Sequence, residues 1–265
     1  MDYDLFNGDA DGICALIQLR LAEPREATLV TGVKRDINLL SRVAAAMGDR
    51  ITVLDVSMDK NMASLQAALT VGAEVFYVDH HFPGEIPRHP QLTAIINEAP
   101  DVCTAALVNG HLDGRYAAWA VTGAFGDNLK DTARALAHSL DVSAADLDAL
   151  EELGTCINYN GYGPSIDDLH FDPEDLYRRL YTAADPLAFV SSDDFRTLSE
   201  GYREDMGLAA TLQPSHASDS SAVFMLPNEA WARRVSGVYS NDLATGSPDR
   251  AHAVLTLKNN GNYLV

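Results

Sequence analysis

Short apolar runs alternate with longer amphipathic stretches through the first hundred residues of the chain. The short runs are rich in β-branched and aromatic residues, which is typical of buried strands, whereas the stretches between them carry apolar residues at helical spacing. Strands are predicted at 3–6, 27–32, 51–55, 74–78 and 92–97, with helices at 13–21, 37–47 and 61–71. Strands that alternate with helices predict βαβ units and a parallel sheet with right-handed crossovers.

The pattern changes after residue 97, where most segments have helical spacing. Helices are predicted at 103–111, 116–124, 128–140, 144–158 and 173–184. A polar segment with linker composition and room for one helix follows. A strand at 222–226, a helix at 228–244 and a hairpin at 251–265, turning at 259–262, come after it. We therefore expect an α/β domain with a parallel sheet and a helical second half over 1–186, a linker over 187–221, and a small, truncated α/β domain over 222–265.

Composition narrows the range of partners. The formal net charge of −19 argues against a surface that holds long duplex nucleic acid by neutralising its phosphates. No apolar run approaches the length needed to cross a bilayer, and the first residues lack the basic start of a signal peptide, so we expect a cytoplasmic protein with no membrane partner. The three cysteines are widely spaced and form no CxxC pair, which supports neither a disulfide framework nor a structural zinc site.

Acidic residues and histidines follow three of the predicted strands, and a further aspartate lies in a glycine-rich loop. These residues are Asp9, Asp11, Asp55, Asp79, His80, His81 and Asp127. The carboxyl ends of parallel strands meet at one edge of a sheet, so these side chains are expected to converge. Taken singly, an aspartate of this kind is better explained as a helix cap, and a histidine pair in a loop as solvated. Together they predict a site for two Mn²⁺ ions, with Mg²⁺ as the alternative.

The order and spacing of these residues resemble the four motifs of the DHH phosphoesterase superfamily over residues 2–185. The resemblance rests on the segments 9–12 (DADG), Asp55, 79–81 (DHH) and Asp127. It implies a hydrolase with two Mn²⁺ ions in a cleft between the DHH domain and a smaller associated domain.

The resemblance also implies a role for each motif residue. Asp9 would ligate one metal, Asp55 would bridge the two, and the other metal would be held by Asp11, His80 and Asp127. His81 would contact the substrate phosphate, and Asp79 would support the histidines. Asp55, His81 and Asp79 are thus the expected catalytic residues.

Two features depart from the superfamily pattern. Many members have histidine where this chain has Asn7, whose carbonyl oxygen is a weaker metal ligand. The associated domain of the superfamily usually carries a glycine-rich GGGH-type motif that grips substrate, and none occurs before Val265. The first departure predicts weaker binding of the first metal, and the second predicts weaker binding of substrate.

Three further residues are candidates for substrate contacts. Lys34 and Arg35 follow the second strand at the same edge of the sheet and could bind phosphate, although a solvated helix start explains them equally well. Asn160 lies in a cluster of tyrosines and glycines at 158–163, where the aromatic rings could stack on a base. A plain helix terminus is the alternative for that cluster.

These observations predict a Mn²⁺-dependent phosphodiesterase that hydrolyses short linear oligonucleotides, or dinucleotides such as pGpG, to mononucleotides. Its alternatives within the enzyme class are a pAp phosphatase, a cyclic-dinucleotide phosphodiesterase and a RecJ-like single-strand exonuclease. A nucleotide-binding regulatory module without turnover is the alternative of another class, which Asn7 and the missing glycine-rich motif favour. The oligomeric state stays open, a homodimer included.

Overall fold

A computed structural model describes residues 1–257 and 261–264 of the chain. Its larger sheet has five parallel strands in the order β2-β1-β3-β4-β5. The strands are β1 (Asp2–Phe6), β2 (Thr28–Val30), β3 (Arg50–Leu54), β4 (Glu74–Asp79) and β5 (Leu92–Ile96). The predicted α/β class and parallel sheet are therefore confirmed. The strand order reverses between β1 and β3, and such a switch point is where open parallel sheets bind ligands.

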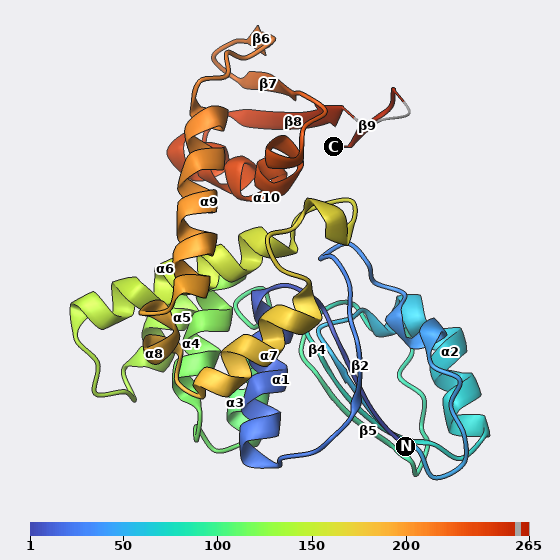
Figure 1. Ribbon diagram of the computed structural model, residues 1–265. Helices are drawn as coiled ribbons and strands as arrows, with labels where there is room; N and C mark the ends of the chain where they lie inside the picture. The colour runs from blue at the N-terminus through green and yellow to red at the C-terminus, as the bar shows by residue number, and fades with distance from the viewer. Residues whose placement is uncertain (258–260, 265) are drawn as a thin grey trace.

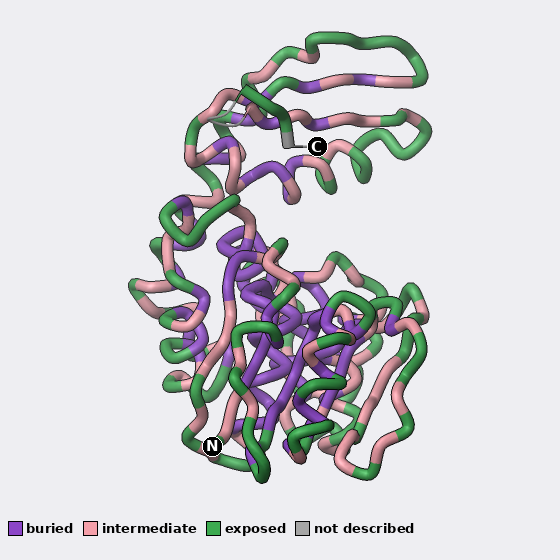
Figure 2. The backbone as a smooth tube through the Cα atoms, turned by 90° about the vertical axis from the view of Figure 1, so that its right-hand side faces the viewer, coloured by how far each residue is buried: buried purple, intermediate pink, exposed green. Residues whose placement is uncertain are grey.

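Helices cover both faces of this sheet (Figure 1). Helix α1 (Ala10–Ala22) packs on one face together with the helical half of the domain, and α2 (Met58–Thr70) packs on the other. The helical half consists of α3 (Thr104–His111), α4 (Ala117–Gly126), α5 (Lys130–Ala137), α6 (Ala144–Gly161), η2 (Ile166–Asp168) and α7 (Pro173–Ala183). Buried residues gather in the sheet and in the helices around it (Figure 2). The strand ends are thus held by a rigid core.

The predicted helix at 37–47 is wrong. The segment forms only the 3₁₀ helix η1 (Leu39–Arg42), although its leucines are buried as the apolar spacing requires. The Asn61 side chain accepts a hydrogen bond from Leu40 N at 3.1 Å and donates to Ile37 O at 2.7 Å. These backbone groups are therefore paired with a side chain from α2 and not with one another.

The segment 187–221, expected to be a linker, is largely helical. Helix α8 (Pro186–Val190) overlaps its start, and α9 (Asp193–Ala210) carries the chain away from the larger sheet to a second, smaller one (Figure 1). That sheet has the strand order β6-β7-β8-β9. Its elements are β6 (His216–Ala217), β7 (Ser221–Leu226), α10 (Ala230–Gly246), β8 (Ala251–Leu257) and β9 (Tyr263–Leu264). Strands β8 and β9 pair antiparallel, as a hairpin requires, but residues 259 and 260 of the predicted turn at 259–262 lie outside the described residues.

Helix α10 lies on the side of the small sheet that faces the larger domain (Figure 1). Two consecutive arginines on it bind the larger domain. Arg233 contacts both carboxylate oxygens of Asp168, at 2.5 and 3.1 Å. Arg234 binds Asp205 at 2.7 Å and the hydroxyl of Tyr159 at 3.0 Å. These largely buried ion pairs fix α10 above the carboxyl edge of the larger sheet.

Among residues 1–257 and 261–264, no helix combines the length and apolar character that spanning a membrane requires.

Candidate active site

The first two aspartates are positioned by the turn between β1 and α1. Asp9 is the N-cap of α1, and its Oδ1 accepts hydrogen bonds from the backbone N–H groups of Asp11 and Gly12 at 3.1 and 3.2 Å. Asp11 is buried, and its carboxylate oxygens accept hydrogen bonds of 2.7 Å from the backbone N–H groups of Thr104 and Ala105 at the start of α3. Asp9 therefore caps its own helix, whereas Asp11 binds the first N–H groups of α3, and these contacts fix the two carboxylates at the strand edge.

Asp55 follows β3 in a left-handed backbone conformation, with φ of 57°. Its side chain is buried, and its Oδ1 accepts a hydrogen bond from the hydroxyl of Thr104 at 3.2 Å. Burial raises the pKa of Asp55 well above its usual value, and the charges of Asp11 and Asp9 raise it further. The site thus holds more negative charge than its protein neighbours balance.

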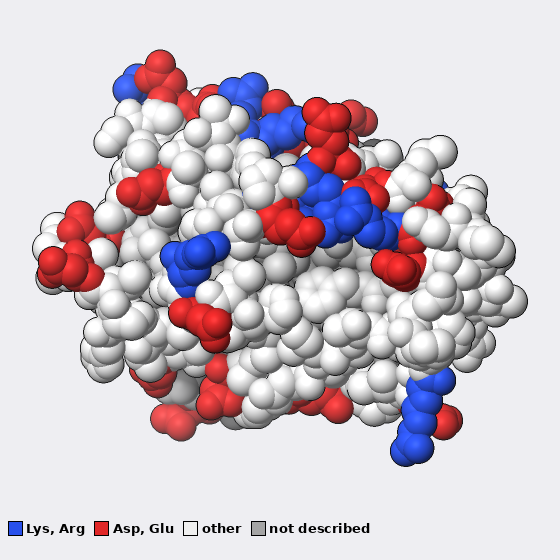
Figure 3. Space-filling model, turned by 90° about the horizontal axis from the view of Figure 1, so that it is seen from below, with Lys and Arg blue, Asp and Glu red and all other residues white. Residues whose placement is uncertain are grey.

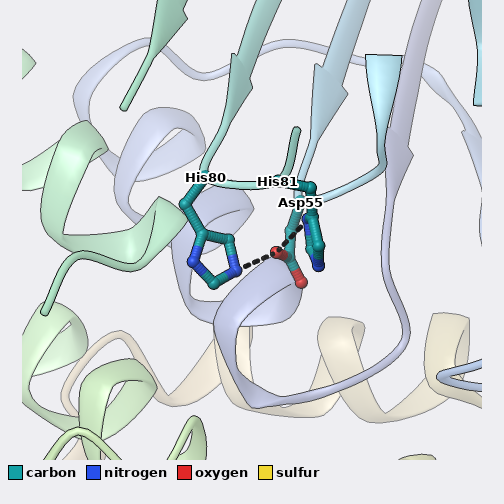
Figure 4. A group of neighbouring side chains, drawn as sticks. All are labelled: Asp55, His80 and His81. Atoms are coloured by element: carbon teal, nitrogen blue, oxygen red, sulfur yellow. Dashed lines mark ion pairs between the residues drawn. The ribbon is translucent and has the colours of Figure 1, made fainter. Parts of the chain in front are cut away.

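The two histidines after β4 turn toward Asp55 (Figure 4). His80 donates from Nδ1 to the carbonyl oxygen of Val102 at 2.8 Å, which leaves Nε2 without a proton in the neutral ring. That Nε2 lies 3.4 Å from Asp55 Oδ1 and 3.8 Å from carboxylate oxygens of both Asp11 and Asp127. A backbone partner on one ring nitrogen and carboxylates around the other is the arrangement in which histidine ligates metals.

His81 is oriented by the carboxylate before it. Its Nδ1 lies 2.7 Å from Asp79 Oδ1, and Asp79 is fully buried. This hydrogen bond raises the pKa of His81 against the effect of its partial burial. The ring is 46 % exposed, so its free edge is accessible to a ligand. The other oxygen of Asp79 has no hydrogen-bond partner among the described residues.

Asp127 completes the cluster from the opposite side, as the residue that ends α4. Burial, with the nearby charge of Asp11 next in importance, raises the pKa of Asp127 to about 7. Ligand atoms of Asp11, His80 and Asp127 lie within 4.8 Å of one another, as do those of Asp55, His80 and His81. A set of carboxylates with one imidazole suits Mn²⁺ or Mg²⁺. These residues therefore fit a divalent cation.

Asp9 belongs to neither group, although its side chain contacts that of Asp55, and its second oxygen is paired with a lysine. Lys34 Nζ lies 2.6 Å from Asp9 Oδ2 and 3.8 Å from Asp127 Oδ1. It also donates to Asn158 Oδ1 at 2.9 Å. Asn7, expected to be a metal ligand, donates from its side chain to the backbone carbonyl of Lys34 at 3.2 Å.

Two predicted substrate residues differ in position. Arg35 is exposed and lines a hollow of about 350 Å³ together with Tyr162 and Arg233. Asn160 does not face the site: its side chain is fully buried, and its amide bonds the backbone of His170 and Phe171. Expecting Asn160 as a substrate contact was therefore wrong.

Sequence reasoning named the segment 158–163 but chose Asn160 within it and not Asn158. It lies two positions earlier in the last part of α6, contacts Lys34, and lines a second hollow of about 290 Å³.

No protein-family model matches this sequence, and no curated protein matches it. Solved structures do match its fold. RecJ exonuclease bound to manganese has a TM-score of 0.59 at 18% identity, over 96% of this chain and 75% of that one. The pGpG-specific phosphodiesterase PggH from Vibrio cholerae has a TM-score of 0.55 at 16% identity, over 98% of this chain and 80% of that one. CDC45 from Entamoeba histolytica has a TM-score of 0.59 at 8% identity, over 98% of this chain and 82% of that one.

Proposed function

We propose, from the premise that this chain has the fold of the DHH phosphoesterases, that it is a metal-dependent phosphodiesterase acting on short linear nucleotides. The observation that carries this proposal is the cluster of Asp11, Asp55, His80 and Asp127 at the switch point of the sheet. Burial, followed by the charge of Asp11, raises the pKa of both Asp55 and Asp127, so two of its carboxylates lie close to other negative charge in a poorly solvated place. A divalent cation would neutralise that charge.

The residues of the cluster divide the chemistry between them. Asp11, His80 and Asp127 would hold the metal, with Asp55 beside them, and Mn²⁺ suits this mixed oxygen and nitrogen set. The bound metal would lower the pKa of a coordinated water and polarise a phosphoryl oxygen. Asp79 orients His81 through Nδ1, which also lies 3.9 Å from Asp55 Oδ1, and the other ring nitrogen would donate a hydrogen bond to a phosphate oxygen.

A short substrate is favoured by the shape of the surroundings. The hollows of about 290 and 350 Å³ are each lined by residues of both the larger domain and α10. Asn158 lines the first and Tyr162 the second, and both residues contact Lys34. Each hollow is near the lower limit for small-ligand sites, which suits one nucleoside and not a long strand. A dinucleotide such as pGpG would place one nucleoside in each.

Charge also argues against a long polyanion. The whole chain carries a formal charge of −19, and on the face seen from below several basic side chains gather toward one edge beside acidic ones while other basic side chains lie apart (Figure 3). A hollow of about 470 Å³ lies at the amino-terminal edge of the sheet, lined in part by Arg25, Arg50 and Glu74. This is the edge opposite the acidic cluster, so the larger hollow does not belong to the proposed reaction.

The experiment that tests the proposal is a product analysis. The purified protein with Mn²⁺ is offered pGpG, a five-nucleotide RNA, pAp and cyclic di-GMP side by side, at equal concentrations. We expect mononucleotide from pGpG first, and loss of activity by orders of magnitude in Asp55→Ala, with Asp131→Ala as the exposed control. If the RNA, pAp or the cyclic dinucleotide is cleaved faster than pGpG, that compound and not pGpG is the preferred substrate.

A second candidate function is nucleotide binding without turnover. The pairing of Asp9 with Lys34 and the neutral Asn7 favour it, since both reduce the number of strong metal ligands. Tight binding of pGpG with no product in the presence of Mn²⁺ would support this function over hydrolysis.

A further inference from the structure

We propose that the Lys34 ammonium takes the place of one of the two metal ions expected from the fold, so that the site works with a single divalent cation. This inference rests on the proposed function and specifies its metal centre. A two-metal site needs Asp9 as a ligand of the first ion, but the free oxygen of Asp9 lies 2.6 Å from Lys34 Nζ. The residues present therefore fit the second ion and not the first.

The lysine is fixed from several sides and does not depend on Asp9 alone. Its Nζ donates to Asn158 Oδ1 at 2.9 Å and lies 5.4 Å from the centre of the Tyr162 ring. Its backbone N–H bonds the carbonyl oxygen of Gly161 at 2.8 Å. The Tyr162 ring is in turn packed against Gly237 of α10, where any side chain would collide with it. The position of the ammonium is thus set by α6 and α10 as well as by its own loop.

Asn7 is part of the same arrangement. Its Nδ2 donates to the backbone carbonyl of Lys34 at 3.2 Å, so its amide helps to hold the lysine. Its Oδ1 is buried and has no hydrogen-bond partner among the described residues, but a neutral amide oxygen is a weaker metal ligand than a carboxylate or an imidazole. Asn7 and Lys34 together convert a metal position into an ammonium position.

The charge of the cluster supports one added cation. Apart from Asp79, which is paired with His81, the aspartates of the cluster are Asp9, Asp11, Asp55 and Asp127, and they bring a charge of −4 if all four ionise. Lys34 neutralises one of these charges, and one divalent cation neutralises two more. A second divalent cation would have to bind beside Asp9. The Lys34 ammonium already lies 2.6 Å from Asp9 and 3.8 Å from Asp127, and two cations bound to the same carboxylates repel each other strongly in a buried site.

Metal stoichiometry tests the proposal without an activity assay. The full chain is freed of metal with chelator, titrated with Mn²⁺ by calorimetry, and examined by electron paramagnetic resonance. We expect one Mn²⁺ per chain and the six-line spectrum of an isolated ion. In the double variant Asn7→His with Lys34→Ala, we expect two ions per chain and the multiline spectrum of an exchange-coupled pair. Lys60→Met, which changes an exposed lysine on α2, should leave the count at one.

The outcomes separate this proposal from the function on which it rests. Two ions and a coupled spectrum in the wild-type protein would overturn the replacement by Lys34 while leaving metal-dependent hydrolysis intact. No bound Mn²⁺ at all would overturn both. A folded double variant that still binds one ion would show that Lys34 does not exclude the second metal, and if that variant does not fold, the wild-type count alone decides.

Discussion

Asp127→Asn should stabilise the metal-free protein, and the gain should grow as the pH rises. The Asp127 carboxyl is largely buried beside Asp11, and burial followed by that charge raises its pKa from 3.8 to about 7. Between these two values the folded state binds a proton that the unfolded state has lost. The stability that this carboxyl contributes is therefore full below pH 4 and is lost as the pH rises toward 7.

The size of the effect follows from the shift. One pKa unit corresponds to about 1.4 kcal/mol, so a rise from 3.8 to about 7 gives about 4 kcal/mol as an upper limit. Asparagine mimics the protonated carboxyl and does not titrate. The variant should thus be more stable than the wild type by about 2 kcal/mol at pH 5 and by about 4 kcal/mol at pH 8, from the same relation.

Urea unfolding in the presence of EDTA, followed by circular dichroism at pH 5 and pH 8, measures this difference. Mn²⁺ should remove more than half of the variant's advantage at pH 8, because the ion binds the folded wild-type protein and the variant lacks one of its ligands. A free ion at a hundred times its dissociation constant stabilises the wild type by about 2.7 kcal/mol.

The control for Asp127→Asn is Asp131→Asn, which changes an exposed carboxylate on α5 and should alter stability little at either pH. A variant that is equally destabilised at pH 5 and pH 8 would refute the reasoning. It would show that Asp127 acts through a specific hydrogen bond and not through unbalanced charge.

Two further predictions concern other buried charges. Arg20→Ala should lower the free energy of unfolding by about 3–5 kcal/mol, since it leaves Asp4, now bound through both oxygens at 2.6 Å, buried and unpaired. Arg178→Ala, which removes an exposed ion pair, should lower the free energy of unfolding by under about 1 kcal/mol. Equal losses for the two variants in urea unfolding would contradict the importance of burial. In the metal-free protein, Asp79→Asn should lower the pKa of His81, because it removes the hydrogen-bonded carboxylate that raises it. An NMR titration of the imidazole ring measures this pKa, and an unchanged value would exclude Asp79 as the cause.

Local periodicity was enough to predict most of the fold. The strand segments are rich in β-branched and aromatic residues and have clear boundaries. The alternation of strands and helices along the chain, and with it the parallel sheet, therefore followed directly. The segment 37–47 failed because buried leucines at helical spacing do not decide between a helix and an irregular loop. The deciding contact is the amide of Asn61, which lies 21 and 24 residues away along the chain from its partners Leu40 and Ile37. Such a contact leaves no mark on the local pattern.

The convergence of the aspartates and histidines could also be predicted, because the ends of parallel strands share an edge whatever the rest of the fold does. The partners of Lys34 could not, since the contact with Asn158 joins positions 124 residues apart. One sign of it was nevertheless present. Asn7 offers a neutral amide where the motif usually has a stronger metal ligand. If one metal ion is lost for that reason, the buried aspartates are left with less positive charge than two metal ions would supply. Buried carboxylates that stay ionised need a cation from elsewhere in the fold, and a lysine at the same sheet edge was the available one.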